Sequence, residues 1–525
     1  MRRKLWLCCV VGILGATVTL LTDHYTNARL GTNDFETFIS PATVTSANFG
    51  KLCTYSVDGD VYAQPLYVPN VSGVTGQSGA VNLLVVATMH SSLYAFNADK
   101  CGAPIWNTNF GTNQAPNSYV NTMGDGIYNR ETGCKGTPII EPSGQMIYSV
   151  CSTATTWVLR KTNLLDGTQV ANVIITGTVS GITFCPLCQQ NTAGATLSNV
   201  AFPASPGRIY VSFGSMFDDA SRGSWYGWVF AYDASLSQTA VFCTTCAGGQ
   251  AKGGVWQAGG GLSVDLSGNL YAITGNGGGT PAAGNLCLSV IKLSPALALL
   301  DWYSTSDYST YNTNDWDLSS GRPMLIPGTS LVVFGDKNYA LTSLNTACMG
   351  NIGGTNNGCT APQTFATGAA SGPSDHRGIY GGVYIPGLHE GFFPNTTGSV
   401  YAFSLTGSTW NTTPVISSGT YQFPGSQMMA SCNNGSACIV WGTMPVSGDA
   451  LLTPRAAKLV AFNPTTLDEY WSSTGRAGDA VGTLAKLTIP TVANGKIYVG
   501  TLDQTVVVYG PNLVNHILIG QIKGL

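Results

Sequence analysis

The feature that most constrains this chain of 525 residues is a short strand-like motif that returns about every sixty residues. Each copy is rich in β-branched and aromatic residues, and stretches with Gly, Asn, Asp and Pro separate the copies. Long helical periodicity is nearly absent. Radial repetition of small antiparallel sheets, a β-propeller, satisfies this pattern and leaves few sheet edges open. The regular copies are residues 83–88, 146–151, 208–213, 269–274, 330–335, 437–442 and 496–501.

The repeat predicts an all-β fold that consists of a single β-propeller with eight four-stranded blades. A seven-bladed ring stays open as an alternative, because residues 377–418 form the least regular unit. The last unit shows only three strand-like stretches, so we expect residues 49–57 to supply its outer strand. Pairing of N- and C-terminal strands would close the ring and remove an unpaired edge. The blades are expected to start near residues 60, 134, 199, 255, 318, 376, 424 and 485.

The first residues are basic and precede an apolar run from Leu5 to Leu21. This order is typical of an export signal, for which Ala16 is the best cleavage candidate. The run has about 17 residues, the lower limit for crossing a bilayer, so an uncleaved N-terminal anchor is the alternative. The protein is therefore expected to be exported, into the periplasm, to the cell surface or outside the cell. The predicted parts are residues 1–21 as signal peptide or anchor, 22–48 as N-terminal extension, 49–510 as propeller and 511–525 as C-terminal tail.

The surface is expected to be polar but weakly charged. Only 9% of the residues are charged, the net charge is −3, and 65 residues are glycine. Nucleic-acid binding needs a basic face, so no nucleic-acid partner is expected. Contact with a membrane is expected only through an uncleaved N-terminal segment. The five histidines lack metal-ligand spacing and no GxSxG motif occurs, so nothing supports hydrolase chemistry.

Cysteine usage agrees with export. The chain has 15 cysteines, and all except Cys8 and Cys9 follow the apolar run, so disulfides are expected. The two CxxC pairs among them could instead form a four-thiolate zinc site. The odd number leaves at least one thiol unpaired, either Cys151 or Cys287. The expected disulfides join Cys185 with Cys188, Cys243 with Cys246, Cys348 with Cys359, Cys432 with Cys438 and, between the first two blades, Cys101 with Cys134.

The first functional interpretation is a non-catalytic binding or assembly module without a cofactor. Its ligand, an unidentified protein or a glycan, would bind at the axial mouth of the ring, the usual concave site. The inner-strand residues expected to face this mouth are Gln64, Arg322, His376, Tyr380 and Gln427.

Four further stretches are distinctive, namely residues 25–29, 57–68, 227–233 and 490–499. They resemble exported bacterial PQQ-like propeller proteins, which are related to the quinoprotein alcohol dehydrogenases. In addition, strands that end in Ala-aromatic-Asn precede Trp106 and Trp471, which is similar to the tryptophan-docking motif of that family. The resemblance implies that these two indoles pack between neighbouring blades.

A further resemblance implies a second functional interpretation, a PQQ- and calcium-dependent quinoprotein dehydrogenase that oxidises alcohols or sugars. The TGN segment that ends at Asn276 resembles the segment that supplies the calcium-binding Asn of those enzymes, and Asp219 would be the acidic calcium ligand. The DWD segment that ends at Asp317 resembles the one that holds the catalytic base. By the same resemblance, Lys337 and Trp256 would contact PQQ. The mature chain lacks the adjacent Cys–Cys pair and the CxxCH haem motif.

Overall fold

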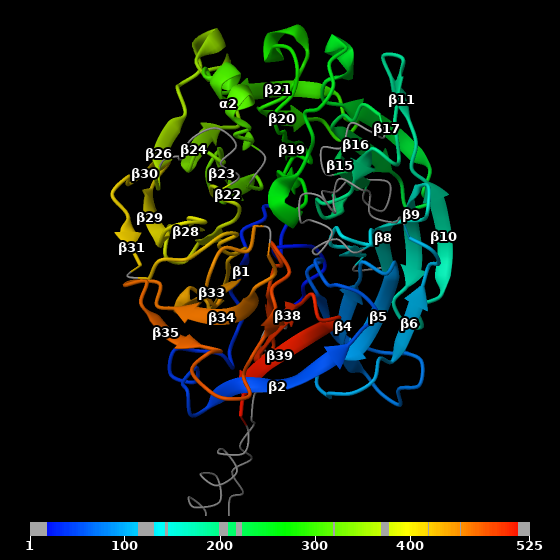
Figure 1. Ribbon diagram of the computed structural model, residues 1–525, viewed down its shortest axis with the longest axis vertical. Helices are drawn as coiled ribbons and strands as arrows, with labels where there is room; N and C mark the ends of the chain where they lie inside the picture. The colour runs from blue at the N-terminus through cyan, green and yellow to red at the C-terminus, as the bar shows by residue number, and fades with distance from the viewer. Residues whose placement is uncertain are drawn as a thin grey trace, which may run out of the picture.

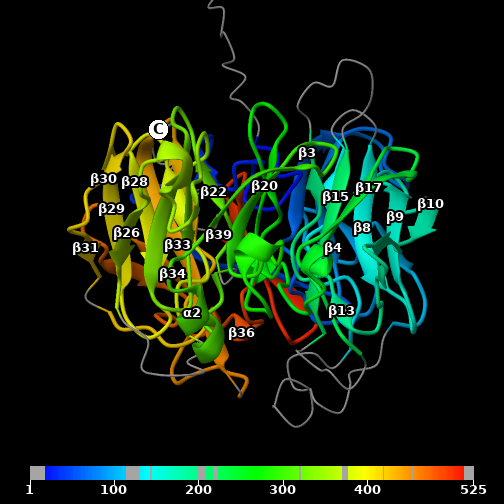
Figure 2. The same ribbon diagram turned by 90° about the horizontal axis from the view of Figure 1, so that it is seen from above.

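The computed structural model describes residues 18–113, 131–141, 145–198, 208–216, 223–318, 321–368, 377–417, 419–451 and 453–512. These residues form an all-β, eight-bladed β-propeller, in which eight sheets surround one axis (Figure 1). Figure 2 shows the same ring after a turn of 90°. None of the helices in the described part of the chain is long and apolar enough to cross a membrane.

In the first four blades, neighbouring strands pair in antiparallel fashion, apart from one parallel outer strand in the fourth blade, and two short strands share the inner position of the third blade. A short hairpin, β11 (Thr178–Val179) and β12 (Ile182–Thr183), lies between the second and third blades in the chain. The strands of these blades are β3 (Leu66–Val71), β4 (Val81–Ala87), β5 (Ser92–Asn97) and β6 (Trp106–Asn109) in blade 1; β7 (Ile139–Ile140), β8 (Met146–Ser152), β9 (Trp157–Asn163) and β10 (Gln169–Ile174) in blade 2; β13 (Gln189–Gln190), β14 (Thr196–Leu197), β15 (Ile209–Ser215), β16 (Trp228–Tyr232) and β17 (Gln238–Cys243) in blade 3; and β18 (Ser263–Val264), β19 (Leu270–Ile273), β20 (Ser289–Leu293), β21 (Leu299–Ser304) and the parallel β25 (Asn351–Ile352) in blade 4.

The other four blades repeat this order, and the irregular sixth unit also forms a complete blade. One α-helix, α2 (Tyr308–Asn314), precedes blade 5 among the described residues. The strands are β22 (Met324–Ile326), β23 (Leu331–Gly335), β24 (Ala340–Asn345) and β26 (Gln363–Ala366) in blade 5; β27 (Val383–Ile385), β28 (Glu390–Pro394), β29 (Val400–Thr406), β30 (Thr409–Trp410) and β31 (Val415–Ile416) in blade 6; β32 (Met429–Asn433), β33 (Ser436–Pro445), β34 (Ala456–Phe462), β35 (Glu469–Ser472), β36 (Gly482–Thr483) and the parallel β1 (Thr32–Asn33) in blade 7; and β37 (Thr491–Ala493), β38 (Lys496–Gly500), β39 (Thr505–Pro511) and β2 (Phe49–Ser56) in blade 8.

The ring closes with strands from both ends of the described chain. Strand β2 pairs in antiparallel fashion with β39, from Phe49 opposite Pro511 to Ser56 opposite Thr505 (Figure 1). The prediction that residues 49–57 complete the last blade is thereby confirmed. This pairing removes an open edge that would otherwise be available for aggregation.

The core lies between adjacent blades. Residues of the second strand β4 are buried on both faces, whereas the outer strand β10 is largely exposed. The tryptophan-docking prediction is confirmed at Trp106, whose Nε1 donates to the Leu164 carbonyl of blade 2 at 3.0 Å. Trp471 likewise reaches blade 8, where its ring meets Tyr509 edge-on. Each indole therefore bridges its own blade to the next one.

Six disulfides connect described residues, and four of them confirm predicted pairs. Each of the four joins cysteines at a sequence separation of 11 or less, so it fixes a local loop. Because both CxxC pairs are oxidised internally, they do not form a zinc site. The confirmed pairs are Cys185 with Cys188, Cys243 with Cys246, Cys348 with Cys359, and Cys432 with Cys438.

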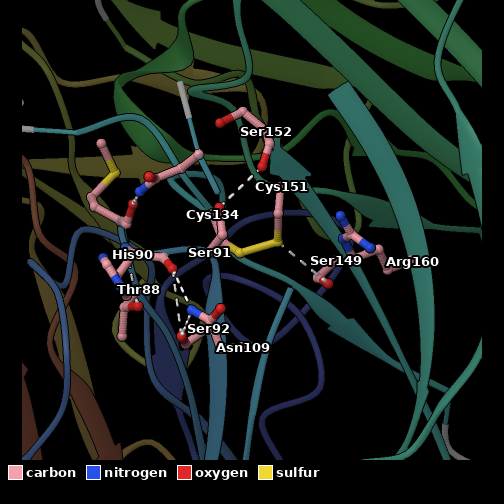
Figure 3. The surroundings of a disulfide bond; sticks show 12 residues. Thr88, His90, Ser91, Ser92, Asn109, Cys134, Ser149, Cys151, Ser152 and Arg160 are labelled. Atoms are coloured by element: carbon pink, nitrogen blue, oxygen red, sulfur yellow. Dashed lines mark hydrogen bonds between the residues drawn. A yellow bond between two sulfur atoms is a disulfide. The ribbon is translucent and has the colours of Figure 1, made fainter. Parts of the chain in front are cut away.

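The predicted bridge between Cys101 and Cys134 is wrong, because these two cysteines face different surroundings. Cys101 is exposed at the rim and pairs with Cys53 of β2, which ring closure brings alongside blade 1. Cys134 is buried beside the second strand of its own blade and pairs with Cys151 (Figure 3). The two remaining disulfides therefore connect residues that the sequence did not pair.

The prediction about an unpaired thiol is resolved by the same pairing. Cys151 is bonded, so it is not the unpaired cysteine. Cys287 is the one unpaired cysteine in the described part of the chain, and it is buried. Burial raises the pKa of the Cys287 thiol to about 11, so the thiol stays protonated and unreactive at neutral pH.

Residues 20–33 lie inside the ring. They include most of the first half of the predicted N-terminal extension. They follow the axis and contact the first strands of the blades, beginning with a bridge from Leu20 to Tyr67 of blade 1. Near its end this segment forms β1, which pairs in parallel with β32 of blade 7. We call residues 20–33 the axial strap.

Candidate functional site

Blades 4 and 5 bring the residues singled out by the quinoprotein resemblance to one end of the ring. Trp256 and Asp317 precede the first strands of their blades, whereas Asn276 and Lys337 follow the second strands. Because the first two strands of a blade are antiparallel, the start of one and the end of the other lie at the same edge. The connecting loops therefore gather these four side chains at a single end of the axis.

A network of close polar contacts joins these loops. Asp317 accepts a hydrogen bond from the backbone N–H of Asn276 at 2.7 Å and forms an ion pair with Lys337 at 2.5 Å. Asp315, which the sequence did not single out, accepts from the Asn276 side-chain amide at 2.6 Å and lies 3.3 Å from the Lys337 ammonium. We call Trp256, Asn276, Asp315, Asp317 and Lys337 the loop-end cluster.

Local backbone geometry explains why both aspartates face the same partners. Helix α2 ends at Asp315, whose φ of 59° is left-handed and whose N–H closes the last turn onto the Tyr311 carbonyl. An aspartate tolerates this conformation better than most residues. The chain turns sharply there, so that Asp315 and Asp317 both meet Lys337 within two residues.

Lys337 stays charged in this environment. Burial alone would lower the pKa of Lys337, but Asp317, Tyr380 and Asp315 outweigh burial and hold it well above its usual value. Two carboxylates and one ammonium leave a single net negative charge. Next to this group, burial raises the pKa of Asp336 to about 7, although hydrogen bonds from Ala340, Tyr311 and Asn338 oppose that shift.

The indole of Trp256 lies directly against glycines. A Cβ atom built on Gly214 would stand 2.9 Å from the Trp256 ring, one on Gly275 3.0 Å, and one on Gly254 3.3 Å. The Cβ on Gly275 would also stand 2.4 Å from Asp317 Oδ1, so this glycine separates the indole from the ion pair. Trp256 as a residue remains partly exposed, and it lies beside a polar network.

The predicted mouth residues occupy another place. Gln64, Arg322 and Gln427 are buried, so the prediction that they line an open mouth is wrong. The axial strap covers them: the backbone N–H of His24 donates to Gln64 Oε1 at 2.9 Å, and Arg322 Nε donates to the Arg29 carbonyl at 3.3 Å. Arg322 also donates to Gln427 Oε1.

The other predicted site residues divide into two groups. Tyr380 is largely buried, packs edge-on against Phe423 and contributes to the electrostatic environment of Lys337, so it belongs near the loop-end cluster. His376 and Asp219 lie outside the described residues.

The described donor set does not fit calcium. A calcium ion needs carboxylate and amide oxygens as ligands, but Lys337 and Asn276 already contact all four carboxylate oxygens of Asp315 and Asp317. The ammonium of Lys337 lies where the metal would have to approach both carboxylates. No cluster of three acidic, histidine or cysteine residues suited to a metal occurs within the described ranges. We therefore derive no step through calcium or PQQ.

Comparison with known proteins agrees with the fold. No protein-family model and no curated protein matches the chain. A europium-containing methanol dehydrogenase is similar in structure over 94% of this chain and 98% of its own, with a TM-score of 0.56 and 10% identity. Saccharomyces cerevisiae Sqt1 covers 89% of this chain and 100% of its own at a TM-score of 0.49 and 8% identity.

BamB from Moraxella catarrhalis is similar over 69% of this chain and 95% of its own, with a TM-score of 0.37 and 13% identity. Identities this low show the fold alone. The structural neighbours thus include a methanol dehydrogenase, and this likeness supports the β-propeller fold. The chain itself is an eight-bladed β-propeller whose particular role has to be argued from its own residues.

Proposed function

We propose that this protein is an exported, non-catalytic binding module whose ligand is a neutral, hydroxyl-rich molecule such as a glycan, bound at the loop-end cluster. The observation that carries the proposal is the partly exposed Trp256 beside the Asp317–Lys337 ion pair. An apolar ring with a few fixed polar groups is the usual make-up of a small-ligand site. The ligand therefore binds at the end of the axis that the loops surround.

The balance of charge supports a neutral ligand. Lys337 is held between Asp315 and Asp317 and is not available as a lone cation for an anionic group. The carboxylates are likewise held by donors, and the Asn276 side-chain oxygen can accept from a hydroxyl. A saccharide can stack one apolar face on an indole while its hydroxyls reach such donors and acceptors.

Titration with chitohexaose and maltoheptaose tests this proposal. The melting temperature and tryptophan fluorescence of the wild type are compared with those of Trp256→Ala, because a ligand that binds only the folded protein raises its melting temperature. Trp302→Ala, on outer strand β21 of the same blade, is the matched control. A shift in the wild type and control but not in Trp256→Ala is expected. Equal binding by Trp256→Ala, or no binding of either saccharide, would overturn the proposal.

One observation favours a second candidate, a PQQ- and calcium-dependent dehydrogenase. Trp256, Asn276, Asp317 and Lys337 converge as the quinoprotein resemblance implies. A methanol dehydrogenase also shares the fold. The ion pair of Lys337 with Asp317 opposes this candidate. The dehydrogenase would be established over the binding module by two results together. The wild type and Asp317→Asn would both bind PQQ in the presence of calcium, and only the wild type would reduce a dye.

Export is supported by the axial strap together with the disulfides. Leu20, near the end of the predicted apolar run, is fully buried in the propeller and pairs with Tyr67. Val18 is buried as well, and the part of the run before it, residues 5–17, would measure about 20 Å as a helix, short of the ~30 Å hydrocarbon core of a bilayer. The same run therefore does not serve both as membrane anchor and as propeller core.

The cleaved signal is thus favoured over the anchor, with removal near Ala16. Six disulfides among the described residues agree with an oxidising compartment. Intact-mass analysis of the protein recovered after export is expected to show a chain that begins at Thr17. Recovery of the full-length chain in the membrane fraction would contradict this part of the proposal.

A further inference from the structure

The axial strap forms hydrogen bonds with every blade. Leu20 exchanges two backbone hydrogen bonds with Tyr67, of 2.8 and 3.2 Å, and the strap runs on around the axis from there. Successive contacts reach successive blades, so this one short segment connects all eight sheets. One contact with each of the other seven blades is Leu21 O with Ile140 N, Asn27 Nδ2 with Leu197 O, Asn27 O with Val264 N, Ala28 O with Leu325 N, Leu30 O with Tyr384 N, Gly31 O with Ala430 N, and Asn33 Nδ2 with Val492 O.

A fully buried ion pair holds the middle of the strap. Asp23, His24 and Arg29 are all 0% exposed, and Arg29 lies 2.8 Å from Asp23. Arg29 also donates to Thr196 Oγ1 at 2.7 Å in blade 3 and to the Leu262 carbonyl at 2.9 Å in blade 4. The guanidinium therefore ties the strap to itself and to two blades at once.

The charge state of this group is defined by burial and by its partners. Burial opposes ionisation of Asp23, yet Arg29 and His24 hold its pKa at about 2. Burial and the nearby Arg322 lower the pKa of His24 to about 3, so this histidine is neutral at ordinary pH. Without Arg29, the charge of Asp23 would be left in the interior, where an unpaired charge is strongly unfavourable.

The strap does not hold its shape by local preference. His24, Tyr25 and Arg29 have left-handed φ values of 56°, 65° and 60°. Such conformations are uncommon outside glycine and unfavourable for Tyr25 and Arg29 in particular, so they persist only where the surroundings impose them. The surroundings here are the first strands of eight different blades, which exist as a set only in the closed ring.

We propose that the axial strap docks as one cooperative unit onto the completed ring, closes the axis below the loop-end cluster, and undocks as a unit before the blades unfold. Its contacts lie along the first strands, at Val264 and Leu325, beyond the loops that carry Trp256 and Asp317. The ligand therefore reaches the axis only from the loop end, and an incomplete ring cannot bind the strap.

Native-state hydrogen exchange of the full chain tests the proposal, because cooperative units exchange through a shared opening. The amides of Ile140, Val264, Leu325, Tyr384 and Ala430, which donate to the strap, are expected to share one opening equilibrium. Their exchange should be at least 100-fold faster than that of second-strand amides in β4 and β8, as a unit that opens before the blades requires.

Substitutions in the middle and at the beginning of the strap distinguish a cooperative unit from separate contacts. Arg29→Ala and, as a milder change, Leu20→Ala should each accelerate exchange of all five amides by one common factor. Arg208→Ala, which removes a contact with the Pro295 carbonyl at the rim, is the matched control and should leave them unchanged. The proposal would be overturned if each substitution accelerated exchange only in the blades next to it. It would also be overturned if the five amides exchanged only at the slow rate of the second-strand amides.

Discussion

Replacing Lys337 with methionine should destabilise the protein by about 3 kcal/mol, because it leaves two carboxylates without their cation. Methionine keeps nearly the same length, so little packing is lost. The side chains of Lys337 and Asp317 are only 12% and 9% exposed, and 2.5 Å separates their charged atoms. Asp315 is 28% exposed and 3.3 Å away, so solvent screens its share. This places the expected change at the lower end of the ~3–5 kcal/mol typical of broken buried pairs.

A double-mutant cycle separates the ion pair from general damage. Asp317→Asn keeps an oxygen for the Asn276 N–H, so Lys337→Met with Asp317→Asn should recover about 2 kcal/mol relative to additivity. The assay is equilibrium urea unfolding followed by tryptophan fluorescence, with the pH fixed. Since the pKa of Lys337 is raised by ionised partners, its contribution is present from neutral pH up to its ordinary pKa and is lost, on the alkaline side, only in strong alkali. A change below ~1 kcal/mol, or strict additivity, would refute the reasoning.

Three further predictions concern packing, pH dependence and a disulfide. Gly275→Ala should cost about 1–3 kcal/mol in urea unfolding and shift the Trp256 fluorescence, because its Cβ would overlap Asp317 Oδ1; Gly79→Ala, where the space is open, should be neutral, and equal effects would contradict the packing. The wild type should lose stability as the pH rises from about 4 to 7. The raised pKa of Asp336, about 7, makes the folded protein hold a proton there that the unfolded chain has already released. Asp336→Asn should remove this pH dependence, and an unchanged dependence would show that another group causes it. Cys53→Ser should cost about 4 kcal/mol, because its bridge closes a loop with a sequence separation of 48, whereas Cys185→Ser, at a separation of 3, should cost far less; similar melting curves would count against this account.

The architecture was predictable because the repeat itself dictates it. Each unit buries one strand on both faces, so the apolar motif survives in the sequence wherever a blade exists. The outer strand from residues 49–57 was predictable for the same reason, since a three-stranded last unit leaves one edge unpaired. Even the irregular unit at residues 377–418 forms a blade, with its outer edge divided between β30 and β31.

The four disulfides with sequence separations of 11 or less were predictable, and the two with separations of 17 and 48 were not. Cys185 with Cys188 and Cys432 with Cys438 are each close in sequence and lie in one loop or hairpin. Cys101, in contrast, meets Cys53 only after the ring has closed, so its partner depends on the whole fold.

The axial strap also escaped prediction. Its contacts lie in eight blades that are spread over the whole chain, and such contacts leave no local periodicity in the sequence. One signal was present: Asp23 and Arg29 are charged residues in a segment of a chain that has few of them.

The candidate site was predicted in part. Resemblance to the quinoprotein dehydrogenases selected Trp256, Asn276, Asp317 and Lys337, which the structure brings together. It did not select Asp315. That residue reaches the cluster because it ends helix α2 in a left-handed backbone conformation, which the sequence pattern does not show. Gln64, Arg322 and Gln427 were misplaced because inner-strand polar residues face the axis, and the strap fills the axis there.

The central claim is that the loop-end cluster binds a hydroxyl-rich ligand without calcium or PQQ. Calorimetric titration of the mature protein with chitohexaose and, separately, with PQQ in the presence and absence of calcium tests it most directly. The account predicts saturable saccharide binding that Trp256→Ala abolishes and Trp302→Ala retains, and no calcium-dependent uptake of PQQ. Saturable PQQ binding that requires calcium, with no saccharide binding, would contradict the account and establish the dehydrogenase in its place.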